Sequence, residues 1–439
     1  MTDPYYSDDH VTLWHGDCLD VLPTLPDASV DSVVTDPPYE LGFMGKGWDA
    51  TGIAYNVTVW RECLRVLKPG GHLLAFGGSR TWHRLAVAIE DAGFELRDSI
   101  AWLYGSGFPK SLDVSKAIDK AAGAEREVIG LKASNRPNVV GQRPGDSMGG
   151  GNYGERVETA PATPDAERWQ GWGTALKPAF EPVVVARKPL EGTVASNVLT
   201  WGTGALNIDA TRVATTDSLG GGANKGMTAE TRHEGFARPW MRDDEAREAA
   251  AARSRENTAR AQALGRWPAN VVLGHTPDCD VIYEGRGEIR LEGPCAPGCP
   301  VAELDRQSGE SSSRIGKPRG AASGDGWGMT ATGAEYADTG GASRFFYVAK
   351  APTSERPRVG GIAHPTVKPL DLMRWLVRLV TPPGGTVLEP FAGSGTTAEA
   401  CVLEGSQCIA IEREADYLPL IVSRLDKPVQ LGLNFGDPA

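Results

Sequence analysis

Two blocks of short β-rich runs alternating with amphipathic helical segments occupy the two ends of the chain, within residues 1–118 and 343–425. This alternation is typical of parallel strands joined by crossover helices. The residues between the blocks lack that rhythm. The sequence therefore predicts an α/β fold: a doubly wound, mostly parallel sheet assembled from both chain ends. A large irregular inserted region would lie at 119–342, and a tail at 426–439.

The elements of the two blocks follow from hydrophobic periodicity and from the Gly and Pro residues that end them. The first block predicts strands over 30–36, 72–78 and 98–107, and helices over 54–71 and 81–94. The Pro-Gly-Gly run at 69–71 is expected to end the first helix. The second block predicts helices over 369–380, 396–405 and 415–425, and strands over 384–390 and 407–412.

The inserted region is rich in Gly, Arg and Ser, and its charge differs from that of the ends. Loops are expected at 141–154, 218–227 and 308–326, and an exposed Ala-rich helix over 243–264. The whole chain carries a net charge of −11, yet residues 100–350 hold 30 Lys and Arg against 31 Asp and Glu. A local basic face there could bind phosphates, although composition alone favours ordinary solvated charges.

The short length of the apolar runs and the scattered positions of the cysteines exclude several classes of protein. No apolar run is long enough to span a bilayer, so no membrane protein is expected. The first ten residues lack the basic and apolar regions of a secretory signal. Seven scattered Cys do not make a disulfide scaffold and fit a reducing cytosol, so the predicted location is cytoplasmic.

The sharpest motif is TDPPY, Thr35 to Tyr39, placed where a parallel strand ends and open α/β sheets bind ligands. The Asp36 carboxylate can accept hydrogen bonds from an amino group, Pro37 and Pro38 stiffen the turn, and Tyr39 offers a face for stacking a base. Holding an exocyclic amine in this way frees its lone pair for attack. The alternative, a structural Asp-Pro turn with a packing Tyr, carries about equal weight for the motif alone.

A second motif, VLEPFAGSGTTAEA over 387–400, joins a buried strand to a helix through a glycine-rich turn. Its glycines let a ligand approach the backbone, and the helix N-terminus favours a carboxylate. The Lys of a phosphate-binding P-loop is missing, which disfavours a nucleoside triphosphatase. Glu412 ends the next strand, where an acid can bind two ribose hydroxyls.

Together, TDPPY, HPTVKP at 364–369 and LEPFAGSGTT resemble the motifs of the amino-group DNA methyltransferases that use S-adenosylmethionine, in phage and bacterial forms. The order, with the catalytic motif first, is similar to that of the β group. The resemblance covers about 1–115 and 343–425 and extends into parts of the middle. It implies a Rossmann-like fold, with 1–118 as the catalytic part, 343–425 as the cofactor-binding part and 119–342 as the target-recognition region.

The resemblance also implies roles for individual residues. Asp36 and the Pro37 carbonyl would bind the target amino group. Pro38 would belong to the same catalytic motif, and Tyr39 would stack on the flipped base. Residues at twelve positions would bind S-adenosylmethionine: Asp17, Cys18, His364, Thr366, Lys368, Glu389, Phe391, Gly393, Ser394, Gly395, Thr396 and Glu412. Within that set, the resemblance implies that Asp17 would lie near the adenine, that Glu412 would hold the ribose, and that the segment with His364 and Lys368 would close over the cofactor. Glu389 departs from the Asp that the family often has.

Four ligand-type residues in the middle have the spacing of a zinc site. His275 and Cys279 form one pair, with a Pro between them, and Cys295 and Cys299 form another, with Pro and Gly between them. Four such ligands suit a closed tetrahedral zinc knuckle. The alternative is two unrelated pairs of buried thiols, and the metal is favoured.

The sequence thus predicts an S-adenosylmethionine-dependent methyltransferase acting on the adenine N6 amino group in duplex DNA. Adenine is favoured over cytosine N4 because family members acting on cytosine more often begin the motif with Ser. The same motifs would also suit an RNA or protein methyltransferase, or a catalytically silent DNA-binding module. A homodimer and a restriction endonuclease partner are left open.

Overall fold

The structure is a computed structural model of the whole chain, and it describes most of the two ends and separate stretches of the middle. The described residues are 3–42, 47–105, 111–132, 156–213, 219–220, 248–249, 252–253, 256, 259–260, 263–276, 279, 282–284, 288–290, 295–296, 299–312, 335–336, 339–349 and 357–426. They form two compact units, one of residues 1–106 with 179–439 and one of residues 107–178. Each unit is described by itself.

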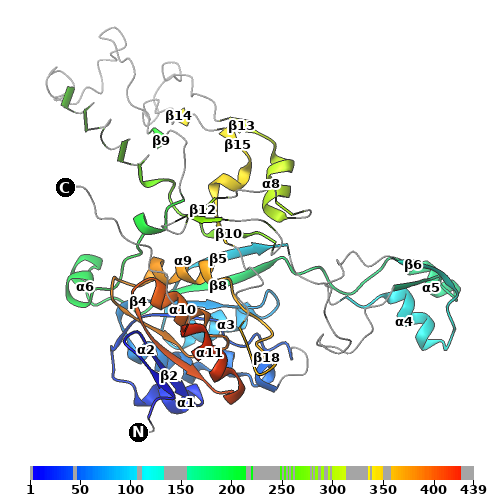
Figure 1. Cartoon of the computed structure of the whole chain (residues 1–439), viewed down its shortest axis with the longest axis horizontal. Helices are drawn as coiled ribbons and strands as arrows, with labels where there is room; N and C mark the ends of the chain where they lie inside the picture. The colour runs from blue at the N-terminus through cyan, green and yellow to red at the C-terminus, as the bar shows by residue number, and fades with distance from the viewer. Residues whose placement is uncertain are drawn as a thin grey trace, which may run out of the picture. The chain divides into compact units, whose positions relative to one another are not determined.

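The larger unit is built on a ten-stranded sheet whose central strands come from both ends of the chain (Figure 1). In spatial order the strands are β1 (Tyr6–Ser7), β2 (Val11–His15), β20 (Gln407–Glu412), β19 (Thr386–Glu389), β3 (Val30–Thr35), β4 (Leu67–Phe76), β8 (Phe180–Arg187), β5 (Glu95–Tyr104), β10 (Val271–Gly274) and β16 (Tyr347–Ala349). The N-terminal β3 pairs in parallel with the C-terminal β19. The predicted assembly of one sheet from both chain ends is therefore confirmed.

The sheet is mostly parallel, with β1 and β8 as its antiparallel members. The sequence predicted β4 and β5 from the rhythm of the first block, but they are not neighbours, because β8 lies between them and pairs with both. Both β8 and β10 belong to the range predicted as an irregular insertion. The apolar run Val183–Val185 explains β8, since each of these side chains is buried.

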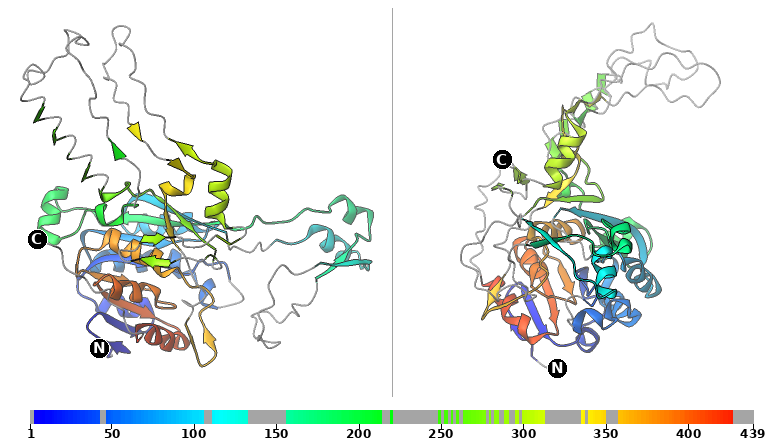
Figure 2. Two further views of the ribbon diagram at one scale, coloured as in Figure 1. Left: turned by 45° about the horizontal axis from the view of Figure 1, so that its top comes forward. Right: turned by 90° about the vertical axis from the view of Figure 1, so that its right-hand side faces the viewer.

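Helices cover both faces of the sheet, as the doubly wound prediction requires. In the right-hand view of Figure 2 the orange and red C-terminal helices lie on one side of the sheet and the blue N-terminal helices on the other. The helices of this unit are α1 (Cys18–Val21), α2 (Val57–Val66), α3 (Trp82–Asp91), α6 (Val194–Trp201), α8 (Pro300–Ser308), α9 (Leu370–Val380), α10 (Thr396–Leu403) and α11 (Leu418–Leu425). Single-turn 3-10 helices are η1 (Leu22–Thr24), η3 (Gly47–Ala50), η4 (Ile53–Tyr55), η5 (Asp209–Thr211), η8 (Ala342–Phe345) and η10 (Ala415–Tyr417).

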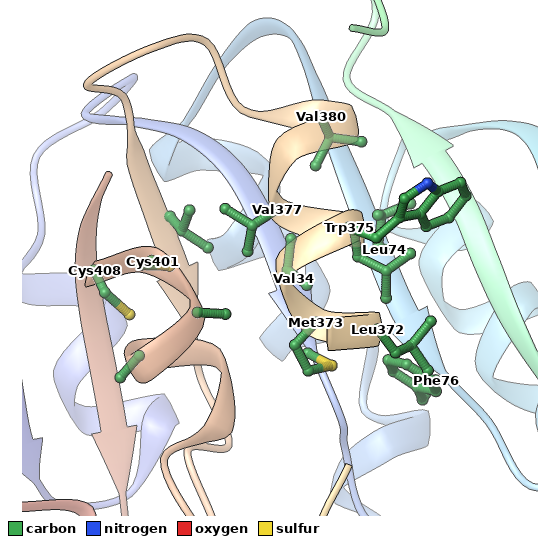
Figure 3. Close-up of a cluster of buried hydrophobic side chains, with 14 of the residues drawn as sticks. Val34, Leu74, Phe76, Leu372, Met373, Trp375, Val377, Val380, Cys401 and Cys408 are labelled. Carbon is green, nitrogen blue, oxygen red and sulfur yellow. The ribbon is translucent and has the colours of Figure 1, made fainter. Parts of the chain in front are cut away.

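The two faces carry separate hydrophobic cores because side chains alternate along each strand. On β3, Val34 packs with α9 and α10, whereas Val33 packs with α2 and α3. Figure 3 shows the first core, where Trp375 and Leu372 of α9 lie against Leu74 of β4. Burial of such apolar side chains is the main stabilising term for the layers.

The predicted end of the first helix is wrong, and the geometry explains why. The helix predicted over 54–71 ends at Val66, and β4 begins at Leu67, so the Pro-Gly-Gly run lies inside the strand. Gly70 has φ +76°, a backbone conformation that residues with a side chain rarely adopt. The pairing with β3 shifts register at this point, from Val30–Leu67 to Ser32–His72. This irregularity in the strand pairing accommodates Pro69, which has no backbone N–H to donate to the neighbouring strand.

The smaller unit combines two helices and a hairpin, α4 (Val114–Ala121), α5 (Pro164–Arg168), β6 (Val128–Lys132) and β7 (Arg156–Thr159). Asp119 of α4 organises it, because its buried carboxylate accepts hydrogen bonds from the Arg126 side chain and from the Thr163 backbone and hydroxyl. A buried charge is tolerated when it is satisfied in this way.

The remaining pairs of short strands are β11 (Ile282–Glu284) with β12 (Glu288–Arg290), β13 (Ser311–Ser312) with β15 (Thr339–Gly340), β9 (Leu219–Gly220) with β14 (Glu335–Tyr336), and β17 (Arg358–Val359) with β18 (Ile362–Ala363). The predicted loop at 141–154, most of the Ala-rich helix at 243–264 and nearly all of the tail lie outside the described residues. The predicted loops at 218–227 and 308–326 contain the short strands β9 and β13, and most of their other residues also lie outside the described ranges. Within the described ranges, no helix has the length and apolar character needed to cross a membrane.

Candidate active site

The carboxyl ends of the parallel strands bring the predicted motifs to one edge of the sheet. Asp36 follows β3, the glycine turn follows β19, and Glu412 is the last residue of β20. Because β8 runs antiparallel to β4, its first residues lie at the same edge, and this brings Glu181 to the motifs. The TDPPY turn and the glycine turn are thus neighbours although about 350 residues separate them in sequence.

Asp36, in the TDPPY turn, forms an ion pair with Lys368. The Lys368 Nζ donates to Asp36 Oδ2 at 2.7 Å and lies 3.3 Å from Glu181 Oε2. It also lies over the rings of Phe76 and Tyr39, at 4.8 and 5.1 Å from their centroids. The sequence grouped Lys368 with the cofactor segment, whereas the structure places its ammonium group at the catalytic turn.

Tyr39 is held by the same group of charges. Its hydroxyl donates to Glu181 Oε2 at 2.8 Å and accepts from Lys368 Nζ at 3.0 Å. The Tyr104 hydroxyl, at the end of β5, donates to the other oxygen of Glu181 at 3.0 Å. Glu181 therefore fixes two tyrosines and a lysine, which orients the Tyr39 ring beside Asp36.

The protonation states of these groups follow from burial and from their mutual charges. Burial raises the pKa of Asp36, the Lys368 ammonium opposes that rise, and the Glu181 charge adds to it. Burial lowers the pKa of Lys368, but the Asp36 and Glu181 carboxylates outweigh it and the net direction is upward. Lys368 is therefore charged at neutral pH. Burial, with the two carboxylates, raises the pKa of Tyr39 well above its usual range, so it remains a hydroxyl.

One oxygen of the Asp36 carboxylate is left for a ligand. Oδ2 is paired with Lys368, whereas Oδ1 is buried and has no hydrogen-bond partner among the described residues. Buried polar atoms without a partner are rare and cost free energy, and they concentrate at functional sites. The carboxylate can accept a hydrogen bond from a donor that enters beside it.

Glu389 joins the catalytic turn to the glycine turn. Its carboxylate accepts from the Thr35 hydroxyl at 2.5 Å, from the Thr397 hydroxyl at 2.6 Å and from the Phe391 backbone N–H at 3.0 Å. Burial raises the pKa of Glu389 to about 8, against the effect of these donors. The residue that departs from the family pattern thus ties the two motifs together.

The glycine turn lies between Glu412 and His364. The Gly393 N–H donates to Glu412 Oε2 at 2.7 Å, and the Glu414 N–H donates to Oε1 at 2.7 Å. Burial raises the pKa of Glu412 to about 7. Gly393 has φ +53°, and a Cβ on it would lie 3.3 Å from His364 Nε2. His364 stacks edge-on against Tyr417, with ring centroids 4.6 Å apart, and its Nδ1 contacts the Thr366 carbonyl.

The second half of the turn is fixed by packing. A Cβ on Gly395 would approach Ile421 of α11 to 2.9 Å, so only glycine fits there. The Ser394 hydroxyl lies 3.0 Å from that of Thr396, and the Ser394 carbonyl accepts from the fully buried Arg424 at 2.9 Å. These contacts hold the backbone for a ligand to approach.

Three further predicted cofactor residues lie on neighbouring elements. Asp17 caps α1 by accepting from the Leu19 N–H at 2.9 Å, and the Gly16 N–H donates to the Glu412 carbonyl. Cys18 is buried, and burial raises the pKa of its thiol to about 12. Phe391 packs toward Trp60, with centroids 6.3 Å apart, so its ring belongs mainly to the core.

Sequence reasoning missed Glu181, Tyr104 and Arg424. Glu181 lies in β8, a strand that the alternation of strands and helices in the sequence did not reveal. Its partners Tyr39 and Lys368 are distant from it in sequence. Arg424 lies in the last turn of an amphipathic helix, where an Arg is ordinarily exposed. Its full burial is visible only in three dimensions.

Comparisons with known proteins find DNA methylases among the similar sequences. A scan of protein families matches the DNA methylase family N6_N4_Mtase over residues 30–138 and 299–423. The type II methyltransferase M.HindIII of Haemophilus influenzae is 28% identical over 149 residues, which cover 33% of this chain and 36% of that protein. M.BamHI of Bacillus amyloliquefaciens is 35% identical over 79 residues, covering 17% and 19%. The matches thus span about a third and a fifth of these curated relatives' lengths.

Two solved structures align along most of the chain. M1.HpyAVI matches with a TM-score of 0.37 and 14% identity, covering 95% of this chain and 98% of that one. The PvuII DNA methyltransferase, described as cytosine-N4-specific, matches with a TM-score of 0.43 and 14% identity, covering 98% and 91%.

Proposed function

The chain belongs to the N6_N4_Mtase family of DNA methylases, and on that premise we propose that it methylates the N6 amino group of adenine in duplex DNA with S-adenosylmethionine. The observation that carries this proposal is the Asp36 carboxylate. It is oriented by Lys368 through one oxygen, while the other oxygen is buried and has no partner among the described residues.

The reaction needs an amine whose lone pair is free. Asp36 Oδ1 accepts one hydrogen of the target amino group, and the Pro37 carbonyl is assigned to the other. Both interactions draw the nitrogen toward tetrahedral geometry. The methylated nitrogen must then lose a proton, and the raised pKa of Asp36 makes its carboxylate a suitable acceptor.

Tyr39 and its neighbours position the base. Glu181 and Lys368 hold the Tyr39 hydroxyl, so the ring has one orientation and offers its face for stacking with a base taken out of the duplex. A small pocket beside the turn is lined by the aromatic residues Tyr39, Tyr55, Phe76 and Trp82 together with small and aliphatic residues such as Ala54, Gly77 and Leu85.

The residues at the glycine turn fit S-adenosylmethionine. A side chain at Gly393 would fill the space beside His364, so the turn leaves its backbone open to a ligand. Glu412, when ionised, has acceptor capacity for ribose hydroxyls beyond its two backbone donors. When bound, the cofactor supplies a methyl group on a positively charged sulfur.

An in vitro transfer assay tests the proposal. Purified protein is incubated with methyl-labelled S-adenosylmethionine and duplex DNA, single-stranded DNA, RNA or a protein extract. The DNA is then hydrolysed to nucleosides and separated by mass. We expect label in N6-methyladenine from duplex DNA.

Each different outcome points to a different assignment. Label in N4-methylcytosine would replace adenine by cytosine, and label confined to RNA or protein would overturn DNA as the substrate. Duplex binding without transfer to any of these substrates would indicate a silent DNA-binding module.

A further inference from the structure

Outside the active site, the structure brings together the four ligand-type residues of the middle segment. The Nδ1 or Nε2 of His275 and the Sγ atoms of Cys279, Cys295 and Cys299 all lie within 4.8 Å of one another. None of these cysteines forms a disulfide. We propose that these four residues hold one Zn²⁺ in a closed, structural site.

The distances between the ligand atoms are close to those in the ligand shell of that ion. Zn–S bonds of about 2.3 Å and Zn–N bonds of about 2.0 Å put the ligand atoms of a tetrahedral site roughly 3.5–3.8 Å apart. His275 Nδ1 lies 3.2 Å from Cys299 Sγ and 3.7 Å from Cys295 Sγ. An imidazole with three thiols is a soft ligand set that selects zinc over Mg²⁺ or Ca²⁺.

Each pair of ligands is built on a tight turn. The Cys279 N–H donates to the Thr276 carbonyl at 3.2 Å, and the Cys299 N–H donates to the Ala296 carbonyl at 3.0 Å. The Ala296 N–H also donates to Cys279 Sγ at 3.4 Å. A hydrogen bond to sulfur stabilises the thiolate that a metal requires, and such outer contacts orient metal ligands.

Regular structure supports the site from two sides. His275 follows β10, and its N–H donates to the Ala349 carbonyl at the end of β16. Cys299 is the residue before α8, and Asp305 of that helix accepts from the Ser343 N–H and hydroxyl at 2.7 and 2.6 Å. The metal would therefore fasten α8 to the end of the sheet.

Burial also favours a bound ion. Cys279 and Cys299 are 1% exposed and His275 is 6% exposed, but among the described residues the apolar cluster around them has only Leu273 and Val301 as further buried members. Such a small core gives little hydrophobic stabilisation. A four-ligand zinc site supplies the missing folding free energy.

Metal analysis of the whole protein tests the site. The protein is produced with zinc in the medium, freed of loose metal by gel filtration and measured by inductively coupled plasma mass spectrometry. We expect about one zinc per chain, and near zero in a Cys295→Ala, Cys299→Ala double variant. Cys63→Ala is the matched control, because Cys63 is a fully buried thiol in α2, and it should keep the metal.

Two results would overturn the site. One is wild-type protein with almost no zinc, or with a disulfide among these cysteines in its intact mass. The other is zinc that stays in a folded double variant. If the double variant does not fold, cobalt replacement in the wild-type protein decides. Tetrahedral cobalt with thiolate ligands absorbs strongly in the visible range, and the absence of those bands would contradict the assignment.

Discussion

At the scale of single residues, the centre of the site is the Asp36 carboxylate, whose properties depend on the charges of Lys368 and Glu181. Asp36 depends on Lys368 for orientation, and Lys368 depends on Glu181 for its second counter-charge. No residue in this group acts alone, since Lys368 and Glu181 change the pKa of Asp36, and the Asp36 and Glu181 carboxylates raise the pKa of Lys368. Their effects on catalysis should therefore appear in the pH dependence of the rate.

Two substitutions should move the acid limb of the pH–rate profile in opposite directions. The rate falls as pH falls because protonated Asp36 no longer accepts from the amine. Glu181→Gln removes a negative charge that raises the pKa of Asp36, so the limb should move to lower pH. Lys368→Met removes the positive charge that lowers it, so the limb should move to higher pH. Single-turnover rates measured across a pH range test this. If the acid limb stays at the same pH in both variants, the proposed effect of Glu181 and Lys368 on the pKa of Asp36 is wrong.

Glu412 gives cofactor binding its own pH dependence. Burial raises the pKa of Glu412 to about 7, and only the ionised carboxylate accepts from both ribose hydroxyls. Affinity should therefore fall as pH falls through 7, by roughly tenfold between pH 8 and pH 6. Calorimetry with wild type and Glu412→Gln checks this. An equal pH dependence in both proteins would assign the titration to another group.

At the scale of elements, the two turns that follow β3 and β19 were the most predictable part of the site. Strand ends, prolines and glycines are local signals, and they placed Asp36 and Gly393 at one edge of the sheet. The antiparallel β8 was not predicted, because a rhythm of strands and helices reveals only parallel crossovers. Glu181 was missed with it. The helix boundary at Val66 was missed because a glycine in the left-handed region allows Pro-Gly-Gly inside a strand.

The glycine turn offers a matched test of space against backbone strain. Gly393→Val should weaken S-adenosylmethionine binding by about tenfold or more, since its side chain would lie beside His364 in the space for the ligand. Gly405→Val is the control, because Gly405 also has a positive φ, +68°, but an added Cβ would meet nothing within 4 Å. Titration calorimetry compares the two. Equal loss of binding would mean that strain, not occupied space, is responsible.

At the scale of the whole molecule, the proposed zinc site and the cofactor turn lie on different strands of one sheet. β10 and β16 are separated from β19 and β20 by β3, β4, β8 and β5. Substitutions at well-separated positions usually act independently. We propose that residues 100–350, which hold 30 of the 45 Lys and Arg, include the DNA-binding part.

Removing the metal should therefore separate two kinds of binding. After chelation, S-adenosylmethionine affinity should change by less than about twofold, because the glycine turn has its own supports in Arg424 and Glu389. Duplex DNA affinity, measured by fluorescence anisotropy, should fall because α8 loses its attachment to the sheet. Loss of cofactor binding together with the metal would contradict this independence.

The most direct test of the central claim is a comparison of modified bases in living cells. Wild type and Asp36→Ala are each expressed in a host without DNA methylation, and genomic DNA is read by single-molecule sequencing. The account predicts N6-methyladenine at one recurring sequence with wild type. With Asp36→Ala, loss of the positioned acceptor should reduce the rate by about a hundredfold or more and remove the signal. An unmodified genome in cells that contain folded wild-type protein, or equal modification with both proteins, would contradict it.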